Sequence, residues 1–214
     1  SIVNVDKQYS IVITSMKIVL LLTFAGASIT LAFAASLENQ GCLNVPAKEK
    51  FEPNKYFNGR WYLTYLQKAL ISPTDVCQES LSNILGDGTI NHKIYSYSDR
   101  RIPQLIELDC TSNLGDIKDD LGKVPFHCKV TKNDKDLGFN MQATIVETDY
   151  DHFALFYVCG KEENEETGNL LLLNREKDGE PTDPRIADTL KKLGLDLSTF
   201  TSSKNVNCKK HPSV

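Results

Sequence analysis

The segment between residues 61 and 175 consists of short apolar runs separated by turn residues. The runs are rich in Val, Ile, Phe and Tyr, which favour strands, and they break at Gly, Asn, Asp and Pro, which favour tight turns. The pattern therefore predicts eight consecutive strands. These are Trp61–Leu66, Ser80–Leu85, Thr89–Tyr97, Pro103–Cys110, Val124–Val130, Leu137–Val146, Phe153–Cys159 and Leu170–Arg175.

One helix is predicted after the last strand. Asp183 can cap its start, Pro184 fits the first helical position, and Gly194 fits just past its end. Apolar residues at helical spacing from Ile186 to Leu193 form a stripe that we expect to pack on the outside of the sheet.

Eight antiparallel strands of this size can close into an up-and-down barrel. Closure removes exposed strand edges, and an eight-stranded barrel can hold one small ligand. A β-sandwich is the alternative, but the meander order and the single late helix favour the barrel. The fold class predicted is thus all-β, an eight-stranded antiparallel barrel with one C-terminal α-helix.

Residues 16–34 have the pattern of a secretory signal peptide. Met16 and Lys17 precede an apolar run, which ends in the small-residue pattern Ala32-Phe33-Ala34. A transmembrane helix is disfavoured because polar and small residues interrupt the run. We expect residues 1–15 to be upstream translated sequence and residues 35–214 to form one secreted domain.

All six cysteines lie within residues 35–214. An even count in a secreted domain predicts three disulfides, although sequence alone does not select among the pairings. The absence of a Cys-x-x-Cys pair argues against a zinc site or a redox motif. The six are Cys42, Cys77, Cys110, Cys128, Cys159 and Cys208.

Charge and motifs exclude several functions. A formal net charge of −4 is unfavourable for nonspecific nucleic-acid binding. There is no Gly-x-Ser-x-Gly elbow, no Gly-rich phosphate loop and no His-Glu-x-x-His motif. We therefore expect a binding protein that is not an enzyme and has no metal, cofactor, nucleic-acid partner or membrane partner.

Three short motifs resemble those of the lipocalins. Gly59-Arg60-Trp61 resembles the Gly-x-Trp motif of the first strand. Thr148-Asp149-Tyr150 resembles the motif between strands six and seven, and Arg175 resembles the arginine that follows strand eight. In an up-and-down barrel these three places lie at the same end. An arginine guanidinium stacks well on an indole face, so we expect Gly59, Trp61, Thr148, Asp149, Tyr150 and Arg175 to form a structural barrel floor.

A narrower resemblance covers residues 35–214. The segments KYFNGRWYLTY and LLLNREKD, with the cysteine spacing, resemble the salivary lipocalins of blood-feeding triatomine bugs, the triabin and nitrophorin group. The resemblance implies the pairs Cys42–Cys159 and Cys77–Cys208, which leaves Cys110 to pair with Cys128.

Haem binding is not expected. Nitrophorins hold haem through a histidine on the third strand, and Ser96 occupies the matching position in Tyr95-Ser96-Tyr97. A serine hydroxyl is not a useful axial ligand. His92 faces the same side but lies about 13 Å away along the strand, at roughly 3.3 Å per residue.

The expected ligand site is the barrel mouth opposite the floor. By the resemblance, Ile94 and Ser96 face the cavity. At the rim, Arg100 and Arg101 could attract phosphate or carboxylate, while acidic residues could attract an amine. The mouth loops are expected at Gln67–Val76, Ser98–Ile102, Lys132–Asp136 and Gly160–Gly168.

The resemblance implies a monomeric, secreted salivary protein that sequesters a small host mediator of haemostasis. ADP, a biogenic amine or an eicosanoid are the candidates, and their removal would inhibit platelet aggregation or vasoconstriction. The alternative is a triabin-like surface inhibitor of a clotting protease such as thrombin. An allergen-like or pigment-carrying lipocalin is a third possibility.

Overall fold

The computed structural model describes residues 42–69, 72–99, 104–132, 135–162 and 165–209. These lie in a compact unit that spans Glu38–Val214. The predicted upstream segment 1–15 and signal peptide 16–34 lie outside the described residues. No helix among the described residues has the length and apolar character needed to cross a membrane.

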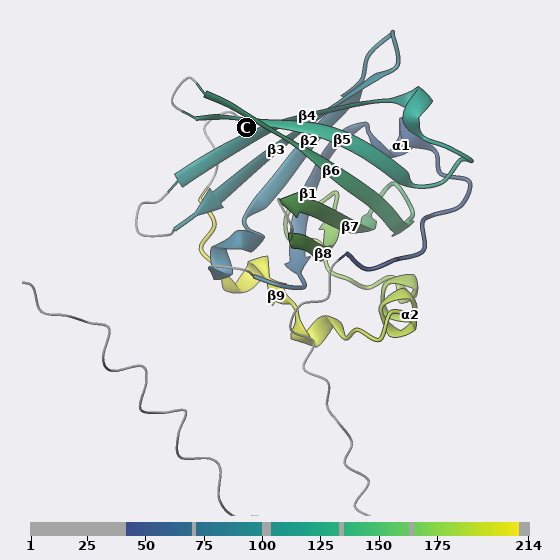
Figure 1. Cartoon of the computed structure of the whole chain (residues 1–214). Helices are drawn as coiled ribbons and strands as arrows, with labels where there is room; N and C mark the ends of the chain where they lie inside the picture. The colour runs from purple at the N-terminus through teal and green to yellow at the C-terminus, as the bar shows by residue number, and fades with distance from the viewer. Residues whose placement is uncertain (1–41, 70–71, 100–103, 133–134, 163–164, 210–214) are drawn as a thin grey trace, which may run out of the picture. The chain divides into compact units, whose positions relative to one another are not determined.

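Eight long strands form an antiparallel meander that closes on itself (Figure 1). Each strand pairs with the next, and β1 pairs with both β2 and β8, so the predicted barrel is confirmed and the sandwich is excluded. A two-residue strand, β9 (Thr201–Ser202), adds to β1. The long strands are β1 (Gly59–Leu66), β2 (Gln78–Ile84), β3 (Thr89–Ser98), β4 (Gln104–Asn113), β5 (Lys123–Lys132), β6 (Lys135–Thr148), β7 (Phe153–Glu162) and β8 (Glu165–Asn174).

At three places the strands extend further than the sequence-based expectation. The predicted acidic loop at Gly160–Gly168 is mostly strand, with Glu162 paired to Glu165. Likewise Lys132 pairs with Lys135, within the predicted loop Lys132–Asp136. β4 also continues to Asn113, beyond the predicted end at Cys110. Charged and polar residues obscured these ends because they do not produce the apolar alternation that marks a strand with one buried face.

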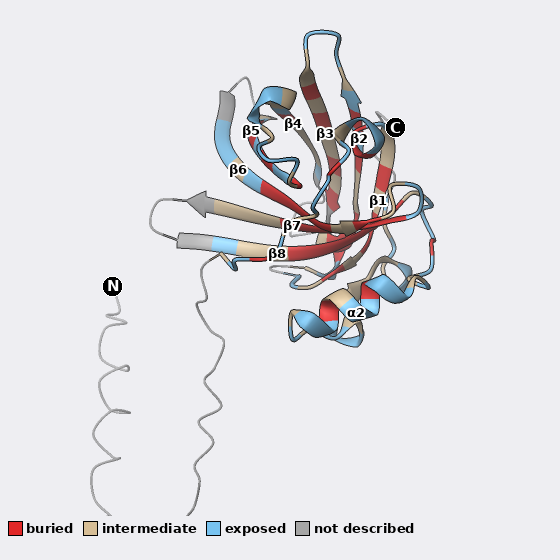
Figure 2. Cartoon of the chain, turned by 90° about the vertical axis from the view of Figure 1, so that its right-hand side faces the viewer, coloured by how far each residue is buried: buried red, intermediate tan, exposed pale blue. Residues whose placement is uncertain are grey.

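Two α-helices and four 3₁₀ turns complete the fold. Asp183 caps α2 through its carboxylate, which accepts from Arg185 N at 2.9 Å. Ile186 and Leu190 of α2 are buried against outward-facing side chains of β6–β8, as predicted (Figure 2). The helices are α1 (Pro53–Tyr56) and α2 (Pro184–Lys192), and the 3₁₀ turns are η1 (Pro73–Val76), η2 (Leu114–Asp116), η3 (Leu197–Thr199) and η4 (Ser203–Asn205).

Three disulfides stabilise the described part of the chain, and two of them tie its ends to the barrel. Cys42–Cys159 joins the N-terminal lead-in to β7, and Cys77–Cys208 joins the C-terminal segment to the start of β2. Cys110–Cys128 links the paired strands β4 and β5 with a Cα–Cα distance of 3.9 Å. The pairs are those that the resemblance implies, and the described residues include no free cysteine.

Gly59 opens β1 in the left-handed backbone region, with φ of +82°. A Cβ atom there would meet nothing closer than Arg175 Nη1 at 3.9 Å, so the constraint is conformational rather than one of space. We expect Gly59→Ala to lower the free energy of unfolding by about 1 kcal/mol, because left-handed backbone is costly for residues with a Cβ. Urea unfolding would measure it. Gly86→Ala is the control, since that Cβ would meet open space and its φ lies outside this region; equal losses in both variants would contradict the argument.

Candidate functional site

The closed end of the barrel is built around Trp61. Its side chain is fully buried, and its indole Nε1 donates to Tyr56 O at 3.1 Å. The Arg175 guanidinium carbon lies 3.7 Å from the centre of the Trp61 ring. The guanidinium therefore covers the indole, and the buried Trp61 ring presents no free face to a ligand.

Arg175 connects three separate parts of the chain at this end. Its guanidinium donates only to main-chain carbonyls, in β1, in the segment before β1 and in the β6–β7 turn. Burial lowers the pKa of Arg175, but five donated hydrogen bonds satisfy the cation. The acceptors are Tyr150 O at 3.0 Å, Asn58 O at 2.8 Å, Arg60 O at 3.0 Å, Lys55 O at 3.1 Å and Tyr56 O at 3.2 Å.

The β6–β7 turn is held by the side chains of Thr148 and Asp149. Thr148 Oγ1 donates to Phe153 O at 2.6 Å, and Asp149 Oδ1 accepts from the backbone N–H groups of His152 and Phe153 at 2.8 and 3.0 Å. Burial alone would raise the pKa of Asp149, yet these bonds and the His152 ring bring it below the usual value. The structure thus places all six predicted floor residues together at one end.

Aromatic rings fill the lower half of the barrel interior. Phe57, Phe126 and Phe156 surround the ring of His92, with centroid distances of 6.3, 5.3 and 6.5 Å. His92 Nδ1 shares a hydrogen bond of 2.7 Å with Ser82 Oγ. Burial lowers the pKa of His92 to about 4, so the ring is neutral at pH 7. Sequence alternation placed His92 on the same face as Ser96 but gave no sign of this packing.

A small space lies above these rings. Its volume is about 30 Å³, enough for a water-sized molecule but not for a mediator. Trp61, His92 and Phe156 form its lower side, and Ile94 and Ser80 line its wall. Any ligand of the barrel must therefore lie in the upper half.

The upper half of the interior is partly open to solvent. The predicted ligand residues Ile94 and Ser96 lie here on the inward face of β3, which they share with His92. Their partners on β4 are Leu108 and Ile106, and all four residues are partly exposed. Further inward-facing residues of this region with partial exposure are Gln78, Val130, Met141 and Val158. Among the interior-facing residues whose side chains the structure describes, none is Asp, Glu, Lys or Arg; the register carries this face on to Lys132, Lys135, Glu162 and Glu165 at the outer ends of the strands.

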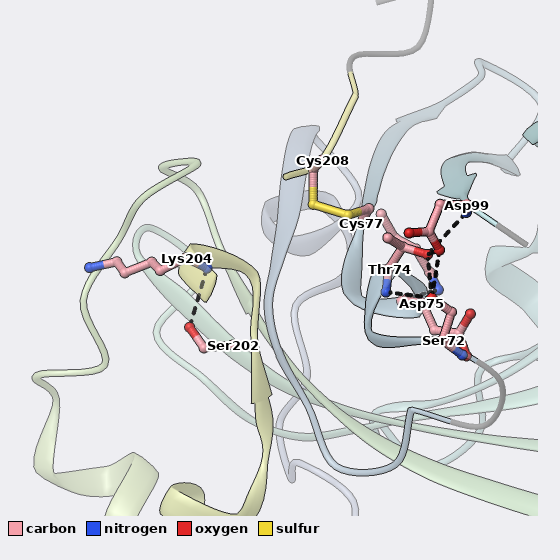
Figure 3. The surroundings of a disulfide bond; sticks show 9 residues. Ser72, Thr74, Asp75, Cys77, Asp99, Ser202, Lys204 and Cys208 are labelled. Atoms are coloured by element: carbon pink, nitrogen blue, oxygen red, sulfur yellow. Dashed lines mark hydrogen bonds between the residues drawn. A yellow bond between two sulfur atoms is a disulfide. The ribbon is translucent and has the colours of Figure 1, made fainter. Parts of the chain in front are cut away.

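Hydrogen bonds fix one side of the mouth. Asp99, at the end of β3, accepts from Ser72 Oγ at 2.6 Å and from Thr74 Oγ1 at 2.7 Å (Figure 3). These hydroxyl groups hold the pKa of Asp99 below its usual value. The predicted ligand residues Arg100 and Arg101 follow directly but lie outside the described residues.

The interior does not fit a haem. Ser96 offers a hydroxyl where an axial ligand is needed. His92 Nδ1 is hydrogen-bonded to Ser82, and three phenyl rings pack around the imidazole, so a macrocycle would have to displace these rings to reach a ring nitrogen. Nor do the described residues contain a group of three His, Cys, Asp or Glu side chains placed to hold a metal ion.

Comparison with known proteins places this barrel among proteins of triatomine bugs. The nitrophorin family model matches residues 42–213. Pallidipin of Meccus pallidipennis is 28% identical over 197 residues, which covers 90% of this chain and 98% of pallidipin. The platelet inhibitor triplatin-2 of Triatoma infestans is 25% identical over 193 residues, covering 90% and 100% of the two chains. The tryptamine complex of the amine-binding protein of Rhodnius prolixus superposes with a TM-score of 0.71 at 18% identity, covering 81% and 92%, which shows a shared fold.

Proposed function

Because the chain belongs to the nitrophorin family, and is related to ligand-binding proteins rather than to enzymes, we propose that it is a secreted salivary protein that sequesters a small host mediator of haemostasis. Removal of the mediator would inhibit platelet aggregation or vasoconstriction. The relationship to triplatin-2, a platelet inhibitor, supports an effect on platelets. Secretion would follow from the signal at residues 16–34.

The lining of the upper barrel favours an eicosanoid over ADP or an amine. This is the observation that carries the proposal: the interior-facing side chains that the structure describes, below the outer strand ends, are apolar or neutral. An ammonium group taken into the barrel would need a carboxylate, and a diphosphate would need several cations, because an unpaired buried charge is costly. A lipid chain requires only apolar contacts, here Ile94, Leu108 and Met141.

The polar groups of the upper half suggest how such a ligand would be oriented. Gln78 and Ser96 are paired across β2 and β3 and offer neutral hydrogen-bonding groups on one wall. Apolar side chains of β4–β7 form the opposite wall. The terminal carboxylate of an eicosanoid would then lie at the mouth, where Arg100 and Arg101 follow β3 in the sequence.

Calorimetric titration tests this proposal. We expect a stable thromboxane analogue to bind with a sub-micromolar dissociation constant, equivalent to about 8 kcal/mol or more. ADP and serotonin should bind at least tenfold more weakly, since neither finds a charge partner on the described inner wall. Failure of all three ligands to bind at micromolar protein would overturn the proposal.

The variant Ser96→Trp should reduce binding of the thromboxane analogue at least tenfold. An indole at this inward, partly exposed position would occupy the space between Ile94 and the mouth. Leu81→Trp is the matched control, because Leu81 faces outward on β2 with 38% of its surface exposed. Unchanged affinity in Ser96→Trp, with both variants folded, would show that the ligand does not enter the barrel.

A surface inhibitor of a clotting protease remains the alternative. The packed lower half of the barrel favours it, because a filled scaffold needs no ligand. In that case the chain would prolong thrombin-dependent clotting, and Ser96→Trp would leave the effect intact. Mediator binding without any effect on thrombin would reject this alternative.

A further inference from the structure

The C-terminal segment covers part of the outer wall of the barrel. It is fixed near one end by the pairing of β9 with β1 and near the other by the Cys77–Cys208 disulfide (Figure 3). Between these anchors, residues 203–207 run past the strands without joining the sheet. The segment is therefore held beside the wall at two points.

A cleft of about 570 Å³ lies between this segment and the wall. Sites for small molecules commonly occupy about 300 to 1,000 Å³, so the volume suits one ligand. The cleft lies beside the upper barrel site: Ser203, Val206 and Lys209 of the C-terminal segment line it, and so do Gln78 and Ser96, which also belong to the upper barrel site. It exceeds the 30 Å³ space inside the barrel by a wide margin.

Strand register places a row of tyrosines on the wall of this cleft. Tyr62 pairs with Glu79, and Glu79 pairs with Tyr95, so these three side chains share the outward face of β1–β3. Their neighbours Trp61 and Ile94 face inward, as alternation requires. Tyr97, two residues along β3, continues the row and is also buried by the segment. Phenol rings on one wall provide a flat apolar surface with polar edges.

The charges around the cleft have an excess of cations. Four basic and two acidic side chains line it. Arg60 is neutralised by Glu79 at 2.7 Å, and Lys204 pairs with Glu180. Lys177 and Lys209 have no ion pair within the part of the chain that the structure describes, and Lys209 Nζ lies 5.6 Å from the centre of the Tyr97 ring. Asp178 is the remaining acid, so cations prevail in a protein whose overall charge is −4.

From the tyrosine row and the two lysines, we propose that this cleft is a second binding site, which takes a small aromatic anion such as an aryl carboxylate or aryl sulfate. The ring would lie against Tyr62, Tyr95 and Tyr97, and the anionic group would lie between Lys177 and Lys209. Aromatic contact and a cation near the ring edge both favour such a ligand.

Titration with 1-naphthalenesulfonate tests the assignment on the full domain. We expect it to bind, and we expect the cation of similar shape, 1-naphthylmethylammonium, to bind at least fivefold more weakly. The double variant Lys177→Gln/Lys209→Gln should weaken sulfonate binding about fivefold, the order expected for two exposed charge contacts. Lys191→Gln/Lys192→Gln is the control, since it makes the same charge change at exposed positions of α2.

Met141→Trp separates this cleft from the barrel interior. It should leave sulfonate binding unchanged, because Met141 faces the interior from β6 and does not line the cleft. The proposal is overturned if the sulfonate does not bind at millimolar concentration, if the ammonium binds as tightly, or if the lysine pair has no more effect than its control. It is also overturned if Met141→Trp abolishes binding, which would place the probe inside the barrel.

Discussion

Replacement of Arg175 by methionine is expected to lower the free energy of unfolding by about 3 kcal/mol, because it leaves several backbone acceptors at the barrel floor without a donor. The wild-type guanidinium serves five carbonyl groups and lies 3.7 Å from the Trp61 ring centre. Methionine keeps much of the apolar bulk over the indole, so the loss reports mainly on the hydrogen bonds. Urea unfolding followed by the fluorescence of the single tryptophan would measure it.

Arg185→Met provides the matched control for this floor variant. Arg185 also lies over an aromatic ring, with its guanidinium carbon 5.1 Å from the centre of Phe153, but it pairs with Asp183 at the surface. Exposed pairs of this kind contribute less than about 1 kcal/mol. If Arg175→Met and Arg185→Met lower the free energy of unfolding by similar amounts, the hydrogen bonds from Arg175 to the carbonyl groups contribute little to stability.

Acidification is expected to destabilise the protein through His92. Its folded pKa is about 4 because the ring is buried, and the unfolded chain has the ordinary value of about 6.5. As pH falls below 6.5 the unfolded state binds the proton first, so stability declines between pH 6.5 and 4, by about 3 kcal/mol in total. Above pH 6.5 this contribution is fully present.

Urea unfolding at pH 7 and pH 4.5 measures the decline, which His92→Phe should largely remove. His152→Ala is the control: its ring is exposed and its pKa is raised by Asp149, so its stabilising contribution is present at low pH and is lost as pH rises. The carboxylate of Asp149 does not interfere, because its lowered pKa acts below pH 3.8. An equal acid-induced decline in wild type and His92→Phe would refute the role of His92.

The sequence predicted the strand segments that form apolar runs. β7 is of this kind, because consecutive residues from Phe153 to Tyr157 are buried, inside the barrel or under α2. The motifs at Trp61, Asp149 and Arg175 located the floor. An apolar run is missing where strand residues are polar, which is why the start of β8 is predicted as a loop.

Two features depend on contacts that no local pattern encodes. The environment of His92 is made by rings from β5, from β7 and from the segment before β1. The outer cleft depends on where the C-terminal segment lies, and that position is set by the Cys77–Cys208 bond rather than by periodicity in residues 203–209. The ligand residues Arg100 and Arg101 stay a prediction.

The pairing of β1 with β8 also determines when the barrel can close during synthesis of the chain. During synthesis β1 emerges first, and its second neighbour is incomplete until Asn174 has left the ribosome. Contacts so distant in sequence form slowly, and an unpaired strand edge invites association with other chains. The nascent chain must therefore be shielded while β1 still has an open edge, and Arg175, which completes the floor, leaves the ribosome only after the last residue of β8.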